Sequence, residues 1–282
     1  MRITRLFGLE YSIGDGNSIF EADYSSPDLV VGSLDDIPAD AVDGDGRKIV
    51  CSWPGVGTFH VENGREITTD LVDDADPTAV RNFLTGIGLG ILLYQDGHLV
   101  VHGSVAEVDG ETVAFVGNKR AGKSTSATAL LARGHEFLSD DIVAVRFDDD
   151  GAPLVVPSFP MFKFDPETFD DTPLPAAPAP DPETGTGKLY YRLNGEFDWS
   201  ERPLTTICLL DPNGDGPRRE RLTGHDALMA VLEHSWSVRL QTADYVDHER
   251  STIEDPDLDR YARLVEHCRV LRVSLDHDHD TL

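Results

Sequence analysis

The chain has 282 residues, of which 51 are acidic and 24 basic, and its formal net charge is −27. Such a surface repels phosphate backbones and anionic lipids, so we expect neither nucleic acid nor a membrane as a partner. No stretch approaches the ~18 consecutive apolar residues of a membrane span. The three cysteines are widely spaced and suggest no disulfide framework, so a cytoplasmic location is expected.

The acidic excess, together with only five lysines, is typical of proteins adapted to high salt. At ~1 M salt the Debye length is only ~3 Å, so repulsion between carboxylates is screened while their hydration keeps the protein dispersed. If the protein is halophilic, as this composition predicts, its thermal stability is expected to increase from low to multimolar KCl, as measured by thermal unfolding at each concentration. Full stability at low salt would indicate an acidic protein without this adaptation.

Residues 1–95 are predicted to form an N-terminal β-rich domain of the α+β class. Asn63-Gly64 predicts a tight hairpin turn. His60 stands alone on a predicted strand and is interpreted as structural or surface-exposed. The apolar or alternating runs that predict strands lie at residues 2–9, 18–24, 48–53, 58–62 and 65–71.

A helix is predicted from Asp76, an N-cap that is followed by proline, to about Tyr94, because apolar residues recur at helical spacing. Gly86, Gly88 and Gly90 interrupt this helix, which indicates close packing or a bend. No strand precedes these glycines, and they read G-x-G-x-G, so the last spacing of the G-x-G-x-x-G dinucleotide fingerprint is missing. We therefore exclude a dinucleotide site here.

Residues 96–282 are predicted to form the second domain. A β-meander that includes a strand over residues 99–105 leads to a strand ending at Val116, and the next residues match G-x-x-x-x-G-K-[ST] without a gap. The glycines let backbone N–H groups approach a polyphosphate, and the helix predicted over residues 124–133 directs its positive end toward the same anion. The expected nucleotide-binding residues are Gly117, Asn118, Lys119, Arg120, Ala121, Gly122, Lys123, Ser124 and Thr125.

This loop predicts ATP and Mg as cofactors. Lys123 supplies a charge for the β- and γ-phosphates, and the Ser124 hydroxyl is placed to ligate Mg²⁺. Asp140 and Asp141 follow the loop helix between apolar segments, where one carboxylate can hold the metal and the other can take a hydroxyl proton. The alternative interpretation, a solvated acidic turn, is the one that we give to residues 148–150.

The rest of the chain is less informative. Lys163 lies among aromatic residues. Two interpretations fit this segment equally well: it lines the substrate side of a site, or it belongs to the hydrophobic core. The Pro-rich residues 170–187 are predicted to form a flexible loop or lid. Strands are expected at residues 204–210 and 269–275, and helices at residues 224–236 and from residue 255 onwards. The final HDHDTL contains metal-binding residue types but is interpreted as a solvated tail.

Four short motifs occur in order: HG at residues 102–103, GNKRAGKST at 117–125, RGH at 133–135 and LSDD at 138–141. Over about residues 95–165 the chain resembles the HPr kinase/phosphorylase family, and more closely its shorter HPr-kinase-like serine kinases. The resemblance implies a PEP-carboxykinase-like P-loop α/β core that follows the β-rich domain. It also implies an ATP- and Mg-dependent kinase that acts on a serine hydroxyl of a protein or peptide.

The resemblance further implies that Lys123 binds phosphates, Ser124 and Asp140 hold Mg²⁺, Asp141 is the general base and His102 is an active-site histidine. The order of roles within the aspartate pair stays open. Thr125 stands where HPr kinases usually carry glutamate, and their RG-containing metal-ligand segment has no clear counterpart here. Phosphorolysis, and HPr itself as the substrate, therefore also stay open.

Two other functions remain as alternatives. One is a small-molecule or carboxykinase-like phosphotransferase, for which the arginines at positions 218, 219 and 221 are candidate anion ligands. The other is a non-catalytic regulatory module that binds a nucleotide and uses the acidic pair only to hold Mg²⁺. A homo-oligomer is compatible with the sequence.

Overall fold

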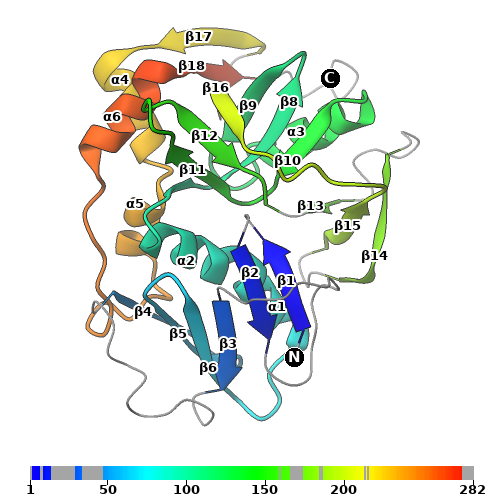
Figure 1. Cartoon of the computed structure of the whole chain (residues 1–282), viewed down its shortest axis with the longest axis vertical. Helices are drawn as coiled ribbons and strands as arrows, with labels where there is room; N and C mark the ends of the chain where they lie inside the picture. The colour runs from blue at the N-terminus through cyan, green and yellow to red at the C-terminus, as the bar shows by residue number, and fades with distance from the viewer. Residues whose placement is uncertain are drawn as a thin grey trace. The chain divides into compact units, whose positions relative to one another are not determined.

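The computed structural model describes residues 2–6, 9–13, 29–33, 47–158, 160–165, 174–183, 187–212, 214 and 216–274. The chain forms two compact units, one comprising Met1–His98 and Trp236–Asp255 and the other Leu99–Ser235 and Pro256–Leu282. Helices and several β-sheets occur together (Figure 1), so the mixed α/β class predicted from the sequence is confirmed. Residues 236–255, which the sequence assigns to the second domain, group with the first unit.

A six-stranded sheet runs through the first unit in the order β1-β2-β3-β6-β5-β4. The hairpin turn predicted at Asn63-Gly64 is confirmed, since these residues have φ angles of 56° and 68°. The strand predicted at residues 18–24 lies outside the described residues. The strands are β1 (Arg2–Leu6), β2 (Leu9–Ile13), β3 (Leu29–Ser33), β4 (Lys48–Trp53), β5 (Gly57–Glu62) and β6 (Glu66–Leu71).

The segment 236–255 covers the outer edge of β4 in this unit. The Ser52 N–H donates to the Tyr245 carbonyl oxygen at 2.9 Å, and the Asp247 N–H donates to the Val50 carbonyl oxygen at 2.9 Å. The first residues of the segment form α5 (Trp236–Thr242). Backbone groups that would otherwise be unpaired at a sheet edge are therefore satisfied by residues far away in the sequence.

The helix expected over residues 76–94 consists of α1 (Pro77–Asn82), the π-helical segment η2 (Phe83–Gly88) and α2 (Leu89–Gln95). Asp76 caps α1, since its carboxylate accepts a hydrogen bond from the Thr78 N–H at 2.9 Å. The glycines have different surroundings within this unit. A Cβ added to Gly90 would lie 2.1 Å from Cζ2 of the buried Trp236, whereas a Cβ on Gly86 would meet no atom within 4 Å.

The Gly90→Ala substitution is expected to lower the free energy of unfolding by about 1–3 kcal/mol, because the new methyl group overpacks the contact with Trp236. Gly86→Ala is the matched control and is expected to leave the stability unchanged or raise it by up to about 1 kcal/mol. Urea-induced unfolding followed by tryptophan fluorescence measures both. Equal effects of the two substitutions would contradict the close packing of Gly90.

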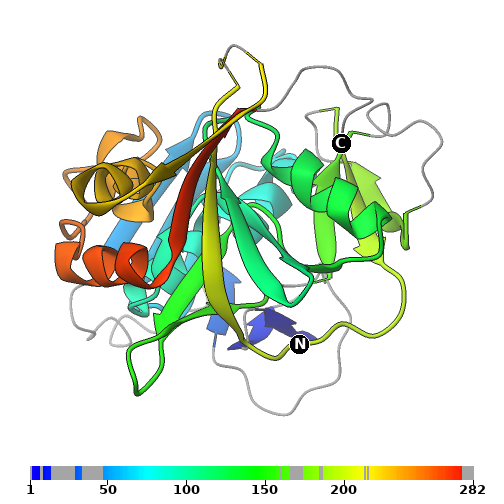
Figure 2. The ribbon, with the colours of Figure 1, turned by 90° about the horizontal axis from the view of Figure 1, so that it is seen from above.

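A nine-stranded mixed sheet forms the framework of the second unit, and its strands β9 (Glu111–Val116), β16 (Arg202–Leu210) and β18 (Arg269–Ser274) are parallel. Helix α3 (Lys123–Ala132) lies on one face of this sheet, and α4 (Gly224–Leu232) and α6 (Leu258–His267) lie on the other (Figure 2). The remaining strands are β7 (Leu99–Val101), β8 (Gly103–Val108), β10 (Glu136–Ser139), β11 (Val143–Phe147), β12 (Pro153–Val156) and β17 (Arg218–Leu222).

The prediction of one strand over residues 99–105 is wrong. The chain bends at His102, so that β7 pairs with β11, whereas β8 pairs with β9 and β10. Gly103 allows this change of partner, because a Cβ there would lie 2.6 Å from the Phe115 carbonyl oxygen of β9. The HG pair therefore marks the point where the chain passes from one part of the sheet to another.

The prediction of a loop over residues 170–187 is also wrong for residues 176–183, while residues 170–173 and 184–186 lie outside the described residues. Residues 176–183 form β14 (Ala176–Glu183), which pairs with β15 (Leu189–Leu193) in a three-stranded sheet completed by β13 (Met161–Phe164). The order β13-β15-β14 puts the proline-rich strand at an edge, where missing backbone N–H groups cost few hydrogen bonds. Composition alone therefore misled the prediction.

Smaller differences concern the C-terminal third. The helix predicted over residues 224–236 stops at Leu232, and the last helix begins at Leu258, where the Asp257 carboxylate caps it. The HDHDTL tail lies outside the described residues. Within the part of the chain that the structure describes, no helix is both long enough and apolar enough to cross a membrane.

Candidate functional site

The strand, loop and helix predicted around residues 113–133 are present as β9, residues 117–122 and α3. Gly122 adopts a left-handed conformation with φ 92° at the N-terminus of α3, and Arg120 has φ 70°. A Cβ on Gly117 would lie 3.0 Å from the Leu210 carbonyl oxygen of β16, so this position favours glycine. The buried Lys123 ammonium donates hydrogen bonds to the carbonyl oxygens of Gly117 and Asn118, both at 2.9 Å.

The other predicted nucleotide-binding residues lie in the same loop or in the first turn of α3. Asn118, Lys119 and Arg120 are exposed and Ala121 is buried, while Ser124 and Thr125 are half-buried. The N-terminal backbone N–H groups of a helix attract anions, as does its positive dipole end. The local geometry therefore suits a phosphate group.

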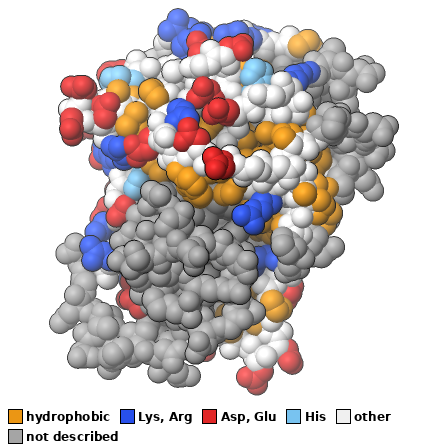
Figure 3. Space-filling model, turned by 45° about the vertical axis from the view of Figure 1, so that its right-hand side comes forward, with side chains coloured by type: hydrophobic (Ala, Val, Ile, Leu, Met, Phe, Trp, Pro, Cys, Tyr) orange, Lys and Arg blue, Asp and Glu red, His pale blue; other side chains and the backbone are white. Residues whose placement is uncertain are grey.

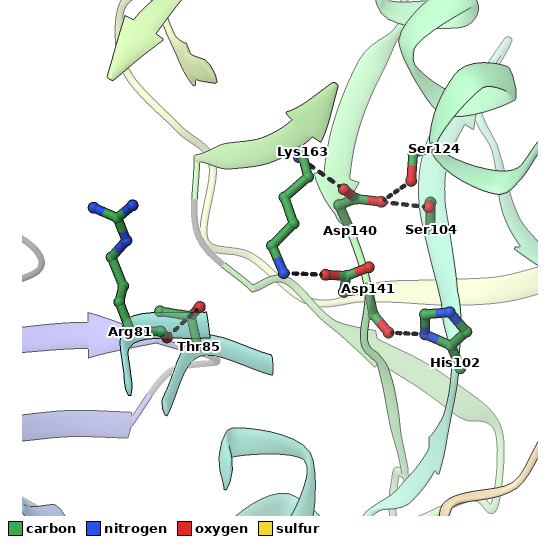
Figure 4. Close-up of polar contacts among 8 residues, drawn as sticks. All are labelled: Arg81, Thr85, His102, Ser104, Ser124, Asp140, Asp141 and Lys163. Atoms are coloured by element: carbon green, nitrogen blue, oxygen red, sulfur yellow. Dashed lines mark hydrogen bonds and ion pairs between the residues drawn. The ribbon is translucent and has the colours of Figure 1, made fainter. Parts of the chain in front are cut away.

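Asp140 joins this loop to two other segments (Figure 4). Its Oδ1 accepts hydrogen bonds from the Ser124 hydroxyl at 2.8 Å and from the Ser104 hydroxyl at 2.6 Å, and its Oδ2 accepts one from the Lys163 N–H at 3.0 Å. Burial and the charge of Asp141 raise the pKa of Asp140, although these hydrogen bonds act in the opposite direction. A group that neutralises this buried carboxylate would stabilise it.

Asp141 has a different environment, although it is the next residue. Its Oδ2 lies 2.7 Å from the Lys163 ammonium, and its side chain is 32% exposed. Burial alone would raise the pKa of Asp141, but the charges of Lys163 and His102 outweigh burial and hold this pKa below its usual range. Asp141 is therefore an ionised carboxylate within reach of solvent.

The backbone at Asp141 is also unusual, since its φ angle is 67°. Asp and Asn are the residues besides glycine that tolerate this left-handed region best. The carbonyl oxygen of Asp141 accepts a hydrogen bond at 2.8 Å from Nδ1 of His102, the predicted active-site histidine (Figure 4). The structure thus brings four of the residues singled out in the sequence together, namely His102, Ser124, Asp140 and Asp141.

Sequence reasoning missed Ser104 and His234 and left Lys163 undecided. Ser104 lies two residues after His102, but nothing in its residue type indicates a contact with Asp140. The His234 carbonyl oxygen accepts a hydrogen bond from the His102 N–H at 3.2 Å. Burial lowers the pKa of His234; the charge of Glu233 opposes this effect and that of Lys123 adds to it. The scarcity of lysine is the feature of the sequence that could have indicated a functional role for Lys163, because few cations offset the acidic charge of this chain.

The donor atoms around Asp140 fit Mg²⁺ better than a transition metal. No group of three or more His, Cys, Asp or Glu residues that could hold a metal ion occurs among the described residues. Mg²⁺ is usually held by one or two carboxylates together with substrate phosphates and water, and it prefers oxygen ligands. The Asp140 carboxylate and the Ser124 hydroxyl offer oxygen atoms of this kind, and their contact at 2.8 Å brings both to one point.

No family model matches this chain. Curated relatives named HPr kinase/phosphorylase match part of it: one from Enterococcus faecalis is 35% identical over 101 residues, which cover 33% of this chain and 32% of the relative. One from Geobacillus sp. is 41% identical over 100 residues, covering 32% of each chain. One from Lactobacillus gasseri is 30% identical over 106 residues, covering 34% of this chain and 33% of the relative. The chain therefore spans about a third of the length of these relatives.

Among solved structures, the Hpr(Ser) kinase/phosphatase from Coxiella burnetii matches 44% of this chain and 72% of its own. The sequence identity is 14% and the TM-score is 0.25. The relationship therefore rests on the sequence matches, and the predicted resemblance to HPr kinase/phosphorylases is confirmed over about a third of the chain.

Proposed function

We propose that this chain, whose resemblance to HPr kinase/phosphorylases covers about a third of its length, is an ATP- and Mg-dependent kinase of a serine hydroxyl in a protein or peptide. The observation that carries the proposal is the contact between the Ser124 hydroxyl and Asp140 at 2.8 Å, with the ionised Asp141 alongside. Phosphoryl transfer requires a phosphate-binding loop, ligands for the metal and a second carboxylate close to one another.

In this proposal each residue has its own role. Lys123 and the N-terminus of α3 bind the phosphates of ATP, and Ser124 and Asp140 hold Mg²⁺. When bound, Mg²⁺ neutralises charge on the phosphate oxygens. The serine oxygen of the acceptor forms a bond to the γ-phosphorus, the bond between this phosphorus and the bridging oxygen breaks, and ADP leaves. Asp141 orients the serine hydroxyl and takes its proton.

The different environments of the two aspartates support these roles. Asp140 is only 4% exposed and receives hydrogen bonds from three donors, which suits a residue that is fixed beside a metal. Asp141 is more exposed, and its pKa is held low. An ionised carboxylate that a substrate can reach suits a base. His102 then acts as a positioning residue, because its Nδ1 contacts the Asp141 carbonyl oxygen at 2.8 Å.

The test is incubation of the protein with γ-labelled ATP, Mg²⁺ and a panel of serine peptides, at KCl concentrations from low to multimolar. We expect label on the peptides and release of ADP. Label on a metabolite but on no peptide would indicate a small-molecule kinase, and nucleotide binding without transfer would indicate a regulatory module. The arginines that suggest the small-molecule enzyme lie on β17, which β18 and β16 separate from β9 in the sheet.

A further inference from the structure

The sheet formed by β13, β15 and β14 has two different faces. Phe162, Phe164, Tyr191 and Leu193 belong to an apolar cluster with residues of α3. Because successive side chains of a strand point to opposite faces, the residues between them face away from α3. These residues are Met161 and Lys163 on β13, which lie opposite Arg192 and Tyr190, respectively, on β15.

Lys188 extends this second face. It directly precedes β15 and lies two residues before Tyr190, so it follows the same alternation. The alternation therefore puts Lys188 on the same face of the sheet as Lys163, whose ammonium contacts the Asp141 carboxylate. We call Lys163, Lys188 and Arg192 the basic face. Lys163 contacts Asp141 directly, while Lys188 and Arg192 are exposed.

This concentration of positive charge is unexpected in a chain with a net charge of −27 and only five lysines. Figure 3 shows that basic and acidic side chains lie next to one another on the molecular surface, so the acidic excess does not exclude a local basic site. Lys188 and Arg192 are four residues apart on an extended chain, which corresponds to ~13 Å at ~3.3 Å per residue. An extended peptide spans that distance with a similar number of residues.

We propose that the basic face is the docking surface for the phosphate acceptor and that it selects a serine flanked by Asp or Glu residues. This inference rests on the proposed kinase function. Lys163 anchors the face to Asp141, and Lys188 and Arg192 pair with carboxylates of the acceptor within a few residues of its serine. Such charge complementarity mainly determines partner selection, because pairs at an exposed rim contribute little affinity each.

The first measurement is binding, which needs no turnover. A fluorescent peptide with one serine flanked by glutamates is titrated with the full-length protein in the presence of Mg²⁺ and ADP, next to a peptide with glutamines in their place. The experiment uses the lowest KCl concentration at which the protein is folded. Wild type is expected to bind the acidic peptide about five- to tenfold more tightly, with a preference that decreases as KCl screens the charges.

The Lys188→Gln/Arg192→Gln double variant is expected to reduce this preference below about twofold, because two exposed pairs are lost. In the transfer assay it should raise KM for the acidic peptide and leave KM for ATP and the kcat unchanged. The control is Arg133→Gln/Arg272→Gln, which removes two exposed cations from the end of α3 and from β18. It is expected to keep the preference of the wild type.

Three results would overturn the docking surface: equal binding of both peptides by the wild type, an equal loss of preference in the control variant, or an effect of the double variant on KM for ATP alone. The last result would assign the basic face to the nucleotide. Transfer to serine peptides without any preference for acidic ones would refute the proposed docking surface but not the proposed kinase function. Tight binding of the acidic peptide without transfer would refute the proposed kinase function but not the proposed docking surface.

Discussion

The Asp141→Asn substitution is expected to lower the rate of phosphate transfer about 10²–10⁴-fold, the usual contribution of a general base. The amide cannot take the proton of the acceptor hydroxyl. Asparagine keeps the shape of the side chain and tolerates the φ angle of 67°, so the backbone should stay in place. Binding of a fluorescent ATP analogue should change little, which separates loss of catalysis from loss of folding.

Asp149→Asn provides the matched control for this experiment. Asp149 is an exposed carboxylate in the turn after β11, so its substitution removes the same charge from the same unit. We expect the control variant to transfer phosphate at the rate of the wild type. Transfer by Asp141→Asn at a similar rate would exclude Asp141 as the base and would leave Asp140 as the candidate for that role.

The Lys123→Ala substitution is expected to lower kcat/KM for ATP about 10²–10³-fold, the cost of removing one charge-stabilising donor from a transition state. The structure adds a second reason, since the Lys123 ammonium donates hydrogen bonds to the carbonyl oxygens of Gly117 and Asn118. Its loss therefore removes contacts within the loop as well as a charge. Binding of the fluorescent ATP analogue should weaken too, in contrast to Asp141→Asn.

Arg133→Ala removes one positive charge at the opposite end of the same helix and serves as the control. Its affinity for the ATP analogue should equal that of the wild type. Unchanged ATP binding by Lys123→Ala would contradict every function proposed for this loop, including the regulatory module. Thermal unfolding of both variants shows whether the loop substitution also affects stability.

The sequence predicts the central part of the second unit well because its signals are local. The β-branched residues of β9, the glycines of the loop and the Ala- and Leu-rich second half of α3 agree with one another, and Gly134 follows the helix with a φ angle of 88°, the left-handed conformation that glycine favours. The same holds for the Asn63-Gly64 turn in the first unit. Where neighbouring residues specify the same conformation, the pattern is sufficient.

The errors of prediction have a common physical cause, which is pairing or contact with another strand of the fold. The bend at His102 depends on the close approach of Gly103 to β9, and the strand conformation of residues 176–183 depends on pairing with β15. The contact of Lys163 with both aspartates depends on where β13 lies. No local propensity encodes such contacts, so residue type alone could not decide between a site and a core for Lys163.

The covering of β4 by residues 236–255 has a consequence for biosynthesis. A ribosome adds about 5–20 residues per second from the N-terminus, so the first unit begins to form long before the segment that completes its sheet edge exists. Until residue 247 has been made, the backbone groups of Val50 and Ser52 lack their partners Asp247 and Tyr245. The unit that starts first is therefore completed late, and a fragment that ends at His98 would expose an open strand edge to other nascent chains.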